Sequence, residues 1–394
     1  MTAHEFDART EAILRDAGSV KWTMFPDTIG AWVAEMDFGV APAVATAMKS
    51  AIDRGETGYL SSARSSELAA ATAARYESAY GWPVPAERVH LVPDVITAFE
   101  LAIEKFSSPG SAIIVPTPAY MPFLLVPPML GRRVIEVPSI ERDGRMVMDL
   151  EGIARAFDDG GGLLVLCNPH NPLGTVFTRD ELDALSLVVE AKGGRVFSDE
   201  IHAPIVYAPA AHVPYASLSD VTAAHTITAA SASKAWNLAG LKCAQVIVSN
   251  EADQDAWLQF GMWAGHGTST LGVIANTAAY TAGGEWLDDV VDYLDGNRRL
   301  LAELVAELLP DARMIAPEGT YIALIDFRAY GLEGDLGEWF RTHARVAMTD
   351  GAACGVAGIG HARLVFALPR PLLREAIERI SAALADRTPA AIEG

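Results

Sequence analysis

Cysteine is scarce in this chain of 394 residues, which contains three: Cys167, Cys243 and Cys354. Because the number is odd and the three positions are far apart, the sequence indicates neither a disulfide framework nor a structural zinc site. A reducing cytoplasm is the simplest setting for thiols of this kind. We therefore expect a cytoplasmic protein without a metal centre.

Positive charge is also scarce. The chain has 30 Lys and Arg residues against 50 Asp and Glu residues, which gives a formal net charge of −20. A surface of this sign repels phosphate groups, so we expect neither nucleic acid nor an anionic membrane as a partner. An anionic small ligand would require a local basic pocket.

Long apolar runs are missing. The longest candidate, residues 123–130, is broken by proline and is too short to span a bilayer. Residues 1–11 carry acidic side chains and no apolar stretch, so we expect no secretory signal peptide. No G-x-G-x-x-G motif follows an early strand-like run, which argues against a dinucleotide-dependent dehydrogenase.

Short apolar runs are present instead, and they alternate with helical segments through the middle of the chain. The runs are residues 89–92, 112–115, 133–137, 163–166, 195–197, 225–228 and 244–248. The clearest helical segments near them are residues 42–54, 67–80, 95–105 and 179–191. This alternation predicts an α/β fold, in which helices cover both faces of a mostly parallel sheet.

The pattern changes after residue 283. A long helix at 285–309 and a breaker-rich link precede strands at 321–327 and 363–366 and helices at 335–343 and 371–386. We expect a smaller α+β domain here, with the irregular residues 1–40 against it. The predicted division is an N-terminal segment 1–45, a large domain 46–283 and a small domain 284–394. The tail, 388–394, is expected to be frayed.

Polar or Gly/Pro-rich loops follow five of the predicted strands. They are residues 93–95, 116–120, 168–174, the loop at Asp199, and residues 231–234. In an open α/β sheet, ligands bind at the carboxyl ends of the strands, so these loops are expected to form one site. Lys234 alone would be assigned to a surface loop. The series of loops makes it a candidate for chemistry.

Several motifs together resemble a known enzyme family. They are T-P-A-Y (117–120), N-P-H-N-P-L-G (168–174), S-D-E-I-H (198–202), S-x-S-K (231–234) and Arg363 before an apolar run. The chain resembles the fold type I pyridoxal-phosphate enzymes of the class I/II aminotransferase superfamily. Within it, Met36-Asp37-Phe38 and Gly58-Tyr59 are similar to the MalY/PatB group of cystathionine β-lyases. The resemblance implies a seven-stranded sheet and the cofactor pyridoxal 5′-phosphate.

The resemblance also implies roles for the residues around the cofactor ring. Lys234 would bind the cofactor covalently and move the proton at the substrate Cα, and Asp199 would hold the pyridine nitrogen protonated. Tyr120 would stack on the ring, and these three form the expected catalytic set. Asn171 and His202 would lie near the phenolic oxygen. Read without the resemblance, Asp199 could be a helix cap, Asn171 a turn residue and His202 a core residue.

The cofactor phosphate and the substrate have their own implied residues. The phosphate would bind the N–H groups of Val95 and Ile96, the hydroxyls of Ser231 and Ser233, and Lys242, which could equally be a solvated lysine. Arg363 would bind the substrate α-carboxylate, with Asn171 and Tyr59 beside the substrate. Tyr59 would also reach the phosphate of a neighbouring subunit, which implies a homodimer with shared sites.

The residues permit two reactions of an amino acid whose Cα proton has been removed. Loss of a thiolate from Cβ would give a thiol, pyruvate and ammonia, whereas reprotonation of the cofactor would give transamination. The resemblance favours the first, a C–S β-lyase acting on cystathionine or related S-substituted cysteines. An aminotransferase is the alternative, and a cofactor-binding regulatory protein is a third hypothesis. The native substrate is not identified by the sequence.

Overall fold

The computed structural model describes residues 3–386, so the tail expected to be frayed lies outside the described residues. The described chain forms two compact units. The large unit comprises Gly39–Val291 and Glu318–Thr320, and the small unit comprises the residues up to Phe38, Asp292–Pro317 and those from Tyr321 onwards. The predicted division at residues 45 and 283 stays a prediction, because compactness alone does not define independent domains. Within residues 3–386, no helix has the length and apolar character needed to cross a membrane.

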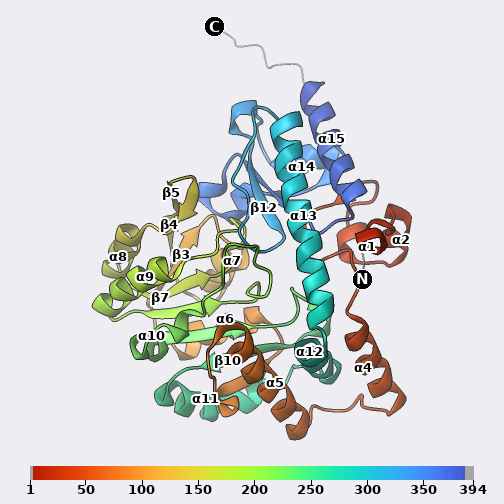
Figure 1. The fold of residues 1–394 in the computed structure, drawn as a ribbon. Coiled ribbons are helices and arrows are strands. Elements are labelled where there is room, and N and C mark those ends of the chain that lie inside the picture. The colour runs from red at the N-terminus through yellow and green to blue at the C-terminus, as the bar shows by residue number, and fades with distance from the viewer. Residues whose placement is uncertain (1–2, 387–394) are drawn as a thin grey trace. The chain divides into compact units, whose positions relative to one another are not determined.

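The large unit is built on a seven-stranded sheet (Figure 1). Its strands are β2 (Val89–Val92), β3 (Ala112–Thr117), β4 (Val134–Pro138), β7 (Gly161–Cys167), β8 (Arg195–Asp199), β9 (Thr226–Ala230) and β10 (Ala244–Val248). They lie in the order β2-β10-β9-β8-β7-β3-β4. Only β10 is antiparallel to its neighbours in this sheet, so the other six strands run in one direction. The prediction of a mostly parallel α/β sheet is confirmed.

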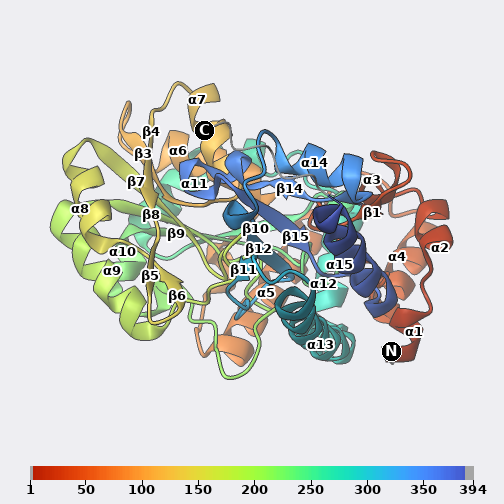
Figure 2. The ribbon, with the colours of Figure 1, turned by 90° about the horizontal axis from the view of Figure 1, so that it is seen from above.

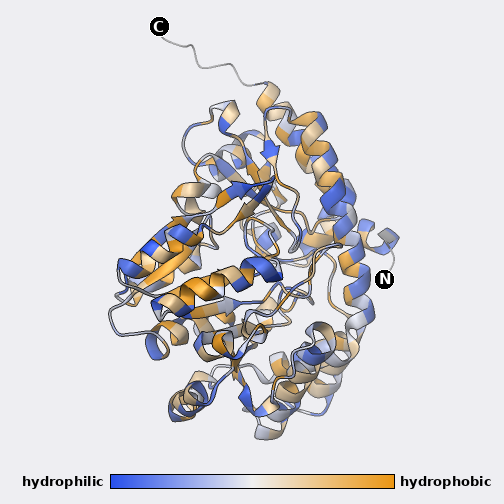
Figure 3. Ribbon diagram, turned by 60° about the vertical axis from the view of Figure 1, so that its left-hand side comes forward, coloured by the Kyte–Doolittle hydropathy of each residue, from blue (hydrophilic) through white to orange (hydrophobic). Residues whose placement is uncertain are grey.

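Helices cover both faces of this sheet (Figure 2). One face carries α6 (Val95–Lys105), α7 (Pro122–Met129) and α11 (Glu251–Ala264); the other carries α5 (Ser62–Tyr80), α8 (Leu150–Asp158), α9 (Arg179–Lys192) and α10 (Asp220–His225). Successive strand residues point to opposite faces, so Phe197 belongs to the core under α6 and Val196 to the core under α9. In Figure 3 the central strands are largely orange, whereas the surface helices mix orange and blue.

The large unit also contains α4 (Pro42–Asp53), α12 (Thr270–Ala282) and a hairpin of β5 (Ile140–Arg142) and β6 (Arg145–Val147). The long helix α13 (Gly284–Leu308) begins in the large unit and ends in the small one. All three cysteines are buried free thiols.

The small unit has an antiparallel sheet in the order β11-β12-β15-β14, with β11 (Arg313–Met314), β12 (Ile322–Asp326), β14 (Thr349–Asp350) and β15 (His361–Val365). A separate parallel pair joins β1 (Ile29–Gly30) to β13 (Val346–Ala347). Its helices, besides the end of α13, are α1 (Ala3–Asp7), α2 (Glu11–Asp16), α3 (Val20–Thr23), α14 (Leu336–His343) and α15 (Arg370–Ala385).

Two predictions about helices were wrong. Residues 1–40 are not wholly irregular, because three short helices lie within them, one of them capped by the Thr10 hydroxyl. Helix α5 begins at Ser62 rather than Glu67, because the Ser61 hydroxyl accepts a hydrogen bond from the Arg64 N–H and so caps an earlier first turn.

Candidate active site

The carboxyl ends of the central strands lie at one level of the sheet. Cys167 at the end of β7 is in register with Asp199 at the end of β8, and Asp199 is in register with Ala229 in β9. In-register residues of parallel strands point to the same face, so Cys167 and Asp199 are side by side on the face covered by α6. The loops after these strands carry the residues predicted for the site.

Asp199 is the most perturbed carboxyl group at this edge. It is 4% exposed, and within residues 3–386 its carboxylate accepts one hydrogen bond, from the Ile201 N–H at 3.1 Å. Burial raises the pKa of Asp199 to about 7, although the Ile201 hydrogen bond and the positive charge of Lys234 both act to lower it. The carboxylate therefore needs a further cationic donor in order to be stably ionised.

Lys234 lies in a loop that hydrogen bonds to other parts of the large unit hold in place. The Ser231 hydroxyl donates to the Cys243 carbonyl at 2.7 Å and accepts from the Ser233 N–H at 3.0 Å. The Ala232 N–H donates to the side-chain oxygen of Asn276 at 3.0 Å. The hydroxyl of Ser231 is thus engaged in shaping the lysine loop, which is a role the sequence did not indicate.

The first turn of α6 offers backbone donors at the same edge. The N–H groups of Val95 and Ile96 open the helix and have no carbonyl partner within it. Asp94 caps the helix by accepting from the Thr97 N–H at 2.8 Å, and Lys242 pairs with Asp94 at 2.8 Å. Burial alone would raise the pKa of Asp94, but the hydrogen bonds from Lys242 and Thr97 hold it below its usual range. The structure therefore brings Lys242 to the start of α6.

The loop after β7 is held by Asn168. The side-chain oxygen of Asn168 accepts from the Phe177 N–H at 3.1 Å, and its backbone N–H donates to the Asp199 carbonyl at 3.0 Å. Asn168 thereby shapes the loop that carries Asn171, which is 5% exposed. In the turn after β8, His202 is 2% exposed and its Nδ1 lies 3.0 Å from the Thr320 hydroxyl.

Tyr120 follows β3 and is partly buried. Its ring meets that of Phe123 edge-on, with the centroids 5.5 Å apart, and it packs against the core under α6. This contact fixes the ring on the same face as Cys167 and Asp199. The stacking role of Tyr120 stays a prediction.

Tyr59 is arranged differently from the strand-end residues. Its side chain is 93% exposed, and its ring stacks on His266 with the centroids 6.2 Å apart. The two rings line a groove of about 690 Å³ that also includes Met262 of α11. Met262 and its neighbour Trp263 are 82% and 75% exposed, so this part of the large unit presents unusually large apolar side chains to the solvent.

Arg363 belongs to the small unit, where it occupies the middle of β15. It is 3% exposed, and its Nη2 donates to the Trp32 carbonyl at 2.7 Å and to the Thr349 hydroxyl at 3.2 Å. A buried, oriented guanidinium of this kind can pair with a carboxylate through two parallel hydrogen bonds.

Glu200 is a site-adjacent residue whose environment the sequence did not reveal. Its carboxylate accepts hydrogen bonds from four groups: the hydroxyls of Tyr76 and Ser198, the Tyr215 N–H and Nε2 of His212. These partners come from α5, β8 and the segment 212–215, on the sheet face opposite to Asp199. The sequence offers one signal for this difference: side chains alternate between the two faces along a strand, so consecutive residues at the end of β8 are expected on opposite faces.

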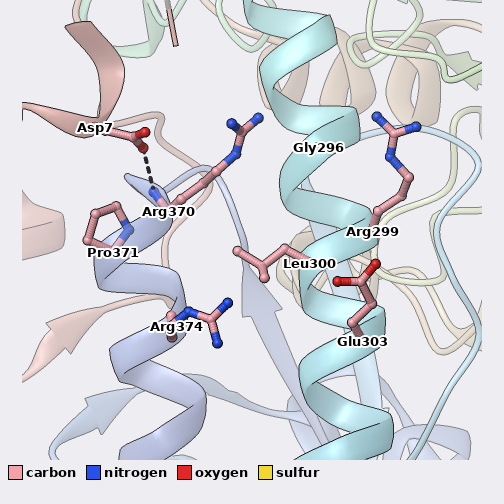
Figure 4. Close-up of a pocket in the computed structure, with 8 residues that line it drawn as sticks. All are labelled: Asp7, Gly296, Arg299, Leu300, Glu303, Arg370, Pro371 and Arg374. Atoms are coloured by element: carbon pink, nitrogen blue, oxygen red, sulfur yellow. Dashed lines mark hydrogen bonds between the residues drawn. The ribbon is translucent and has the colours of Figure 1, made fainter. Parts of the chain in front are cut away.

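A groove in the small unit is lined by several arginines (Figure 4). It has a volume of about 620 Å³ and lies between α13 and α15, with Asp7 at one end. Arg370 in this groove is already engaged, because its Nε donates to the Asn297 side-chain oxygen and its N–H donates to Asp7. None of the residues predicted for the active site lines this groove.

The strand-end residues of the large unit fit pyridoxal phosphate. The pyridine nitrogen of this cofactor is the cationic donor that the buried Asp199 carboxylate requires, its aldehyde is a partner for the Lys234 amine, and its phosphate suits the N–H groups at the start of α6. The high pKa of Asp199 is the observation behind this fit. In the described part of the chain, no cluster of three or more His, Cys, Asp or Glu side chains could hold a metal ion.

Comparison with known proteins gives concordant matches. Residues 31–380 match the family described as aminotransferase class I and II. The chain is 41% identical over 372 residues to a protein named cystathionine beta-lyase from Corynebacterium glutamicum, covering 94% of this chain and 98% of that protein.

Solved structures are similar over nearly the whole chain. A putative PLP-dependent beta-cystathionase from Corynebacterium diphtheriae superposes with a TM-score of 0.91 at 38% identity, covering 96% of this chain and 99% of the other. A PLP-bound C–S lyase from Staphylococcus hominis superposes with a TM-score of 0.88 at 26% identity, covering 97% and 98%.

Proposed function

Because the chain belongs to the aminotransferase class I and II family, we propose that it is a pyridoxal-phosphate-dependent C–S β-lyase. Its substrates are cystathionine or related S-substituted cysteines, and its products are a thiol, pyruvate and ammonia. The observation that carries the proposal is the buried Asp199 carboxyl, whose pKa is raised to about 7 beside the charge of Lys234. Relatives named for C–S cleavage support the choice of reaction.

Lys234 is the base in the proposed reaction. Its amine would hold the cofactor covalently at rest and, once freed, would remove the proton from the substrate Cα. The loop that carries it is fixed by Ser231 and Asn276, which limits the directions from which the amine can approach. The bound cofactor supplies the electron sink for the electron pair left at Cα.

Asp199 and Arg363 provide the fixed charges. Asp199 keeps a proton on the pyridine nitrogen, because a carboxylate in so dry a position strongly favours a cationic neighbour. Arg363 binds the α-carboxylate of the amino acid. Val95, Ile96, Ser233 and Lys242 hold the phosphate, and Tyr120, Asn171 and His202 hold the ring and its phenolic oxygen.

Elimination follows when Cβ carries a sulfur leaving group. The electron pair from the broken Cα–H bond forms the Cα–Cβ double bond, the Cβ–S bond breaks, and the thiolate takes up a proton and leaves. Water then hydrolyses the remaining three-carbon fragment to pyruvate and ammonia. An enzyme committed to this course needs no keto-acid acceptor, whereas an aminotransferase does.

A matched pair of substrates tests the proposal. S-methylcysteine carries a methylthio group on Cβ, which can leave as methanethiol. In 2-aminobutyrate a methyl group takes the place of the methylthio group, and it cannot leave. Without a keto acid, the enzyme should release methanethiol and pyruvate from the first and no keto acid beyond one equivalent from the second. One-equivalent conversion of both substrates would instead identify an aminotransferase, and a protein that gains no visible absorbance with pyridoxal phosphate would exclude both enzymes.

We also propose that the protein is a homodimer with shared active sites. Support comes from Tyr59, which is 93% exposed, and from the exposed Met262 and Trp263 in the same region. A second copy of the chain would bury these rings, and Tyr59 would then contact the phosphate held by the partner. A cytoplasmic location is proposed on the basis of the three unpaired, buried thiols.

A further inference from the structure

Arg363 is oriented by two groups, the Trp32 carbonyl and the Thr349 hydroxyl, which are themselves hydrogen-bonded to each other. Its Nη2 donates to the Trp32 carbonyl at 2.7 Å and to the Thr349 hydroxyl at 3.2 Å, and the Thr349 hydroxyl donates to the same carbonyl at 3.0 Å. A threonine hydroxyl has one proton, so it accepts from Arg363 and donates to Trp32 at the same time. Two acceptors on one nitrogen fix the plane of the guanidinium.

The Trp32 carbonyl comes from a segment far away in the sequence. That segment is joined to the strands on either side of it: the Ala31 N–H donates to the Ala347 carbonyl at 2.9 Å, and the Val365 N–H donates to the Ala31 carbonyl at 2.8 Å. The Trp32 indole N–H donates to the Lys21 carbonyl at 3.2 Å. Gly30 is required here, because a Cβ at this position would collide with the same carbonyl. The position of the Trp32 carbonyl is therefore determined by α3 and by β13 and β15.

A buried ion pair anchors this segment. The ammonium of Lys21 donates to Asp37 at 2.9 Å, to the Glu35 carbonyl at 3.0 Å and to the Ala367 carbonyl at 3.3 Å, so each of its three protons has an acceptor. The Trp22 indole N–H donates to the other oxygen of Asp37 at 2.9 Å. Burial lowers the pKa of Lys21 and raises that of Asp37, so each side chain depends on the other to remain charged.

We propose that Thr349 is a positioning residue for carboxylate binding, and that the Trp32 carbonyl and the Lys21–Asp37 pair complete the same support. Bidentate pairing with a carboxylate requires a guanidinium held in one plane, and the Thr349 hydroxyl bridges the arginine to the anchored segment. This inference rests on the proposed role of Arg363. It identifies a determinant of affinity for the α-carboxylate that does not itself touch the substrate.

The test compares Thr349→Val, which removes the hydroxyl at nearly constant volume, with Thr349→Ser, which restores it. The ligands are S-benzylcysteine as substrate and S-benzylcysteamine, which lacks the carboxylate, as competitive inhibitor. Thr349→Val should raise KM about fivefold with kcat little changed, because one charge-assisted hydrogen bond to the arginine is lost. The inhibition constant of the amine should not change, and Thr349→Ser should restore KM.

Two outcomes contradict the inference: an unchanged KM in Thr349→Val, or equal weakening of acid and amine, which would indicate a structural role only. Thr342→Val is the matched control, because Thr342 is an exposed threonine of α14 in the same unit. Arg363→Lys distinguishes failure of the proposed role of Arg363 from failure of the proposed role of Thr349. If it leaves KM unchanged, the proposed role of Arg363 fails; if it raises KM while Thr349→Val does not, only the role of Thr349 fails.

Discussion

Asp199 and Glu200 are consecutive in the chain and both are buried, but their carboxylates have opposite surroundings. Glu200 accepts hydrogen bonds from four donors on one face of the sheet, whereas Asp199, on the other face, accepts one from residues 3–386. Glu200 is thus satisfied by the protein alone. Asp199 is held at a raised pKa and is completed only by a ligand that brings a positive charge.

This difference predicts that isosteric substitutions at the two positions have different effects. Asp199→Asn should lower kcat by at least about a hundredfold, because the proton on the pyridine nitrogen loses its counter-ion. At about pH 4, where the native Asp199 is protonated when folded, the unfolding midpoint of the cofactor-free variant should stay close to that of the native protein. Glu200→Gln should cost roughly 2–3 kcal/mol of stability, because buried donors lose an acceptor, while the cofactor still binds. Urea unfolding and initial rates measure both. Equal effects of the two substitutions on activity would contradict the assignment.

The stability of the cofactor-free protein should depend on pH through Asp199. The pKa of Asp199 is about 7 in the folded chain, and its ordinary value, 3.8, applies to the unfolded chain. Between pH 3.8 and about 7 the folded protein therefore binds more protons than the unfolded protein. The free energy of unfolding contributed by Asp199 is therefore fully present below about pH 4 and is lost as the pH rises through about 7. The loss is on the order of 4 kcal/mol at most.

Asp199→Asn is the reference for this measurement, because it removes the titration and leaves the rest of the protein intact. The difference in unfolding free energy between the two cofactor-free proteins should change between pH 4 and 7. In the cofactor-loaded protein the change should disappear, since a cation beside Asp199 lowers its pKa. A pH-dependent difference that persists after loading would exclude contact between Asp199 and the cofactor.

The Lys21–Asp37 pair should be costly to break. Asp37→Asn leaves the Lys21 ammonium buried without its counter-ion and should cost about 3–5 kcal/mol in chemical denaturation. The double variant Lys21→Met with Asp37→Leu should lose less, because no unpaired charge remains. Asp158→Asn is the control, since Asp158 pairs with Lys192 while its side chain is 62% exposed, and it should cost less than about 1 kcal/mol. Greater loss in the double variant than in Asp37→Asn would refute this account.

The exposed apolar residues near Tyr59 should control assembly. Trp263→Glu places a charge in the proposed interface and should convert the dimer into monomers with reduced affinity for the cofactor. Leu187→Glu is the matched control, because Leu187 is 67% exposed on α9, a helix that carries no predicted interface residue. Light scattering measures the mass of each variant. A monomeric native protein, or a dimer that Trp263→Glu leaves intact, would contradict the proposed interface.

Much of the large unit was predictable because its strands are buried on both faces. Such strands appear in the sequence as short apolar runs, and the turn after each one exposes the polar residues that form the site. For this reason the strand before Asp199 and the loop before Lys234 were both expected. Helix α6 was predicted at Val95–Lys105, the bounds that the structure has, and the structure shows Asp94 capping its first turn.

Other features depend on contacts between distant parts of the chain. The antiparallel direction of β10 is set by its neighbours β2 and β9, and the run of apolar residues gives no direction. Helices α8, α11 and α12 were not predicted. The support of Arg363 by the Trp32 carbonyl joins residues 331 positions apart, and a backbone carbonyl leaves no mark in a sequence motif.

The most direct measurement counts products per active site. The cofactor-loaded protein is mixed with excess cystathionine and no keto acid, and homocysteine, pyruvate and ammonia are determined over time. A C–S β-lyase should form the three products in equal amounts and in many equivalents per site. Formation of one equivalent of keto acid, followed by arrest until a keto acid is added, would show that the protein is an aminotransferase instead.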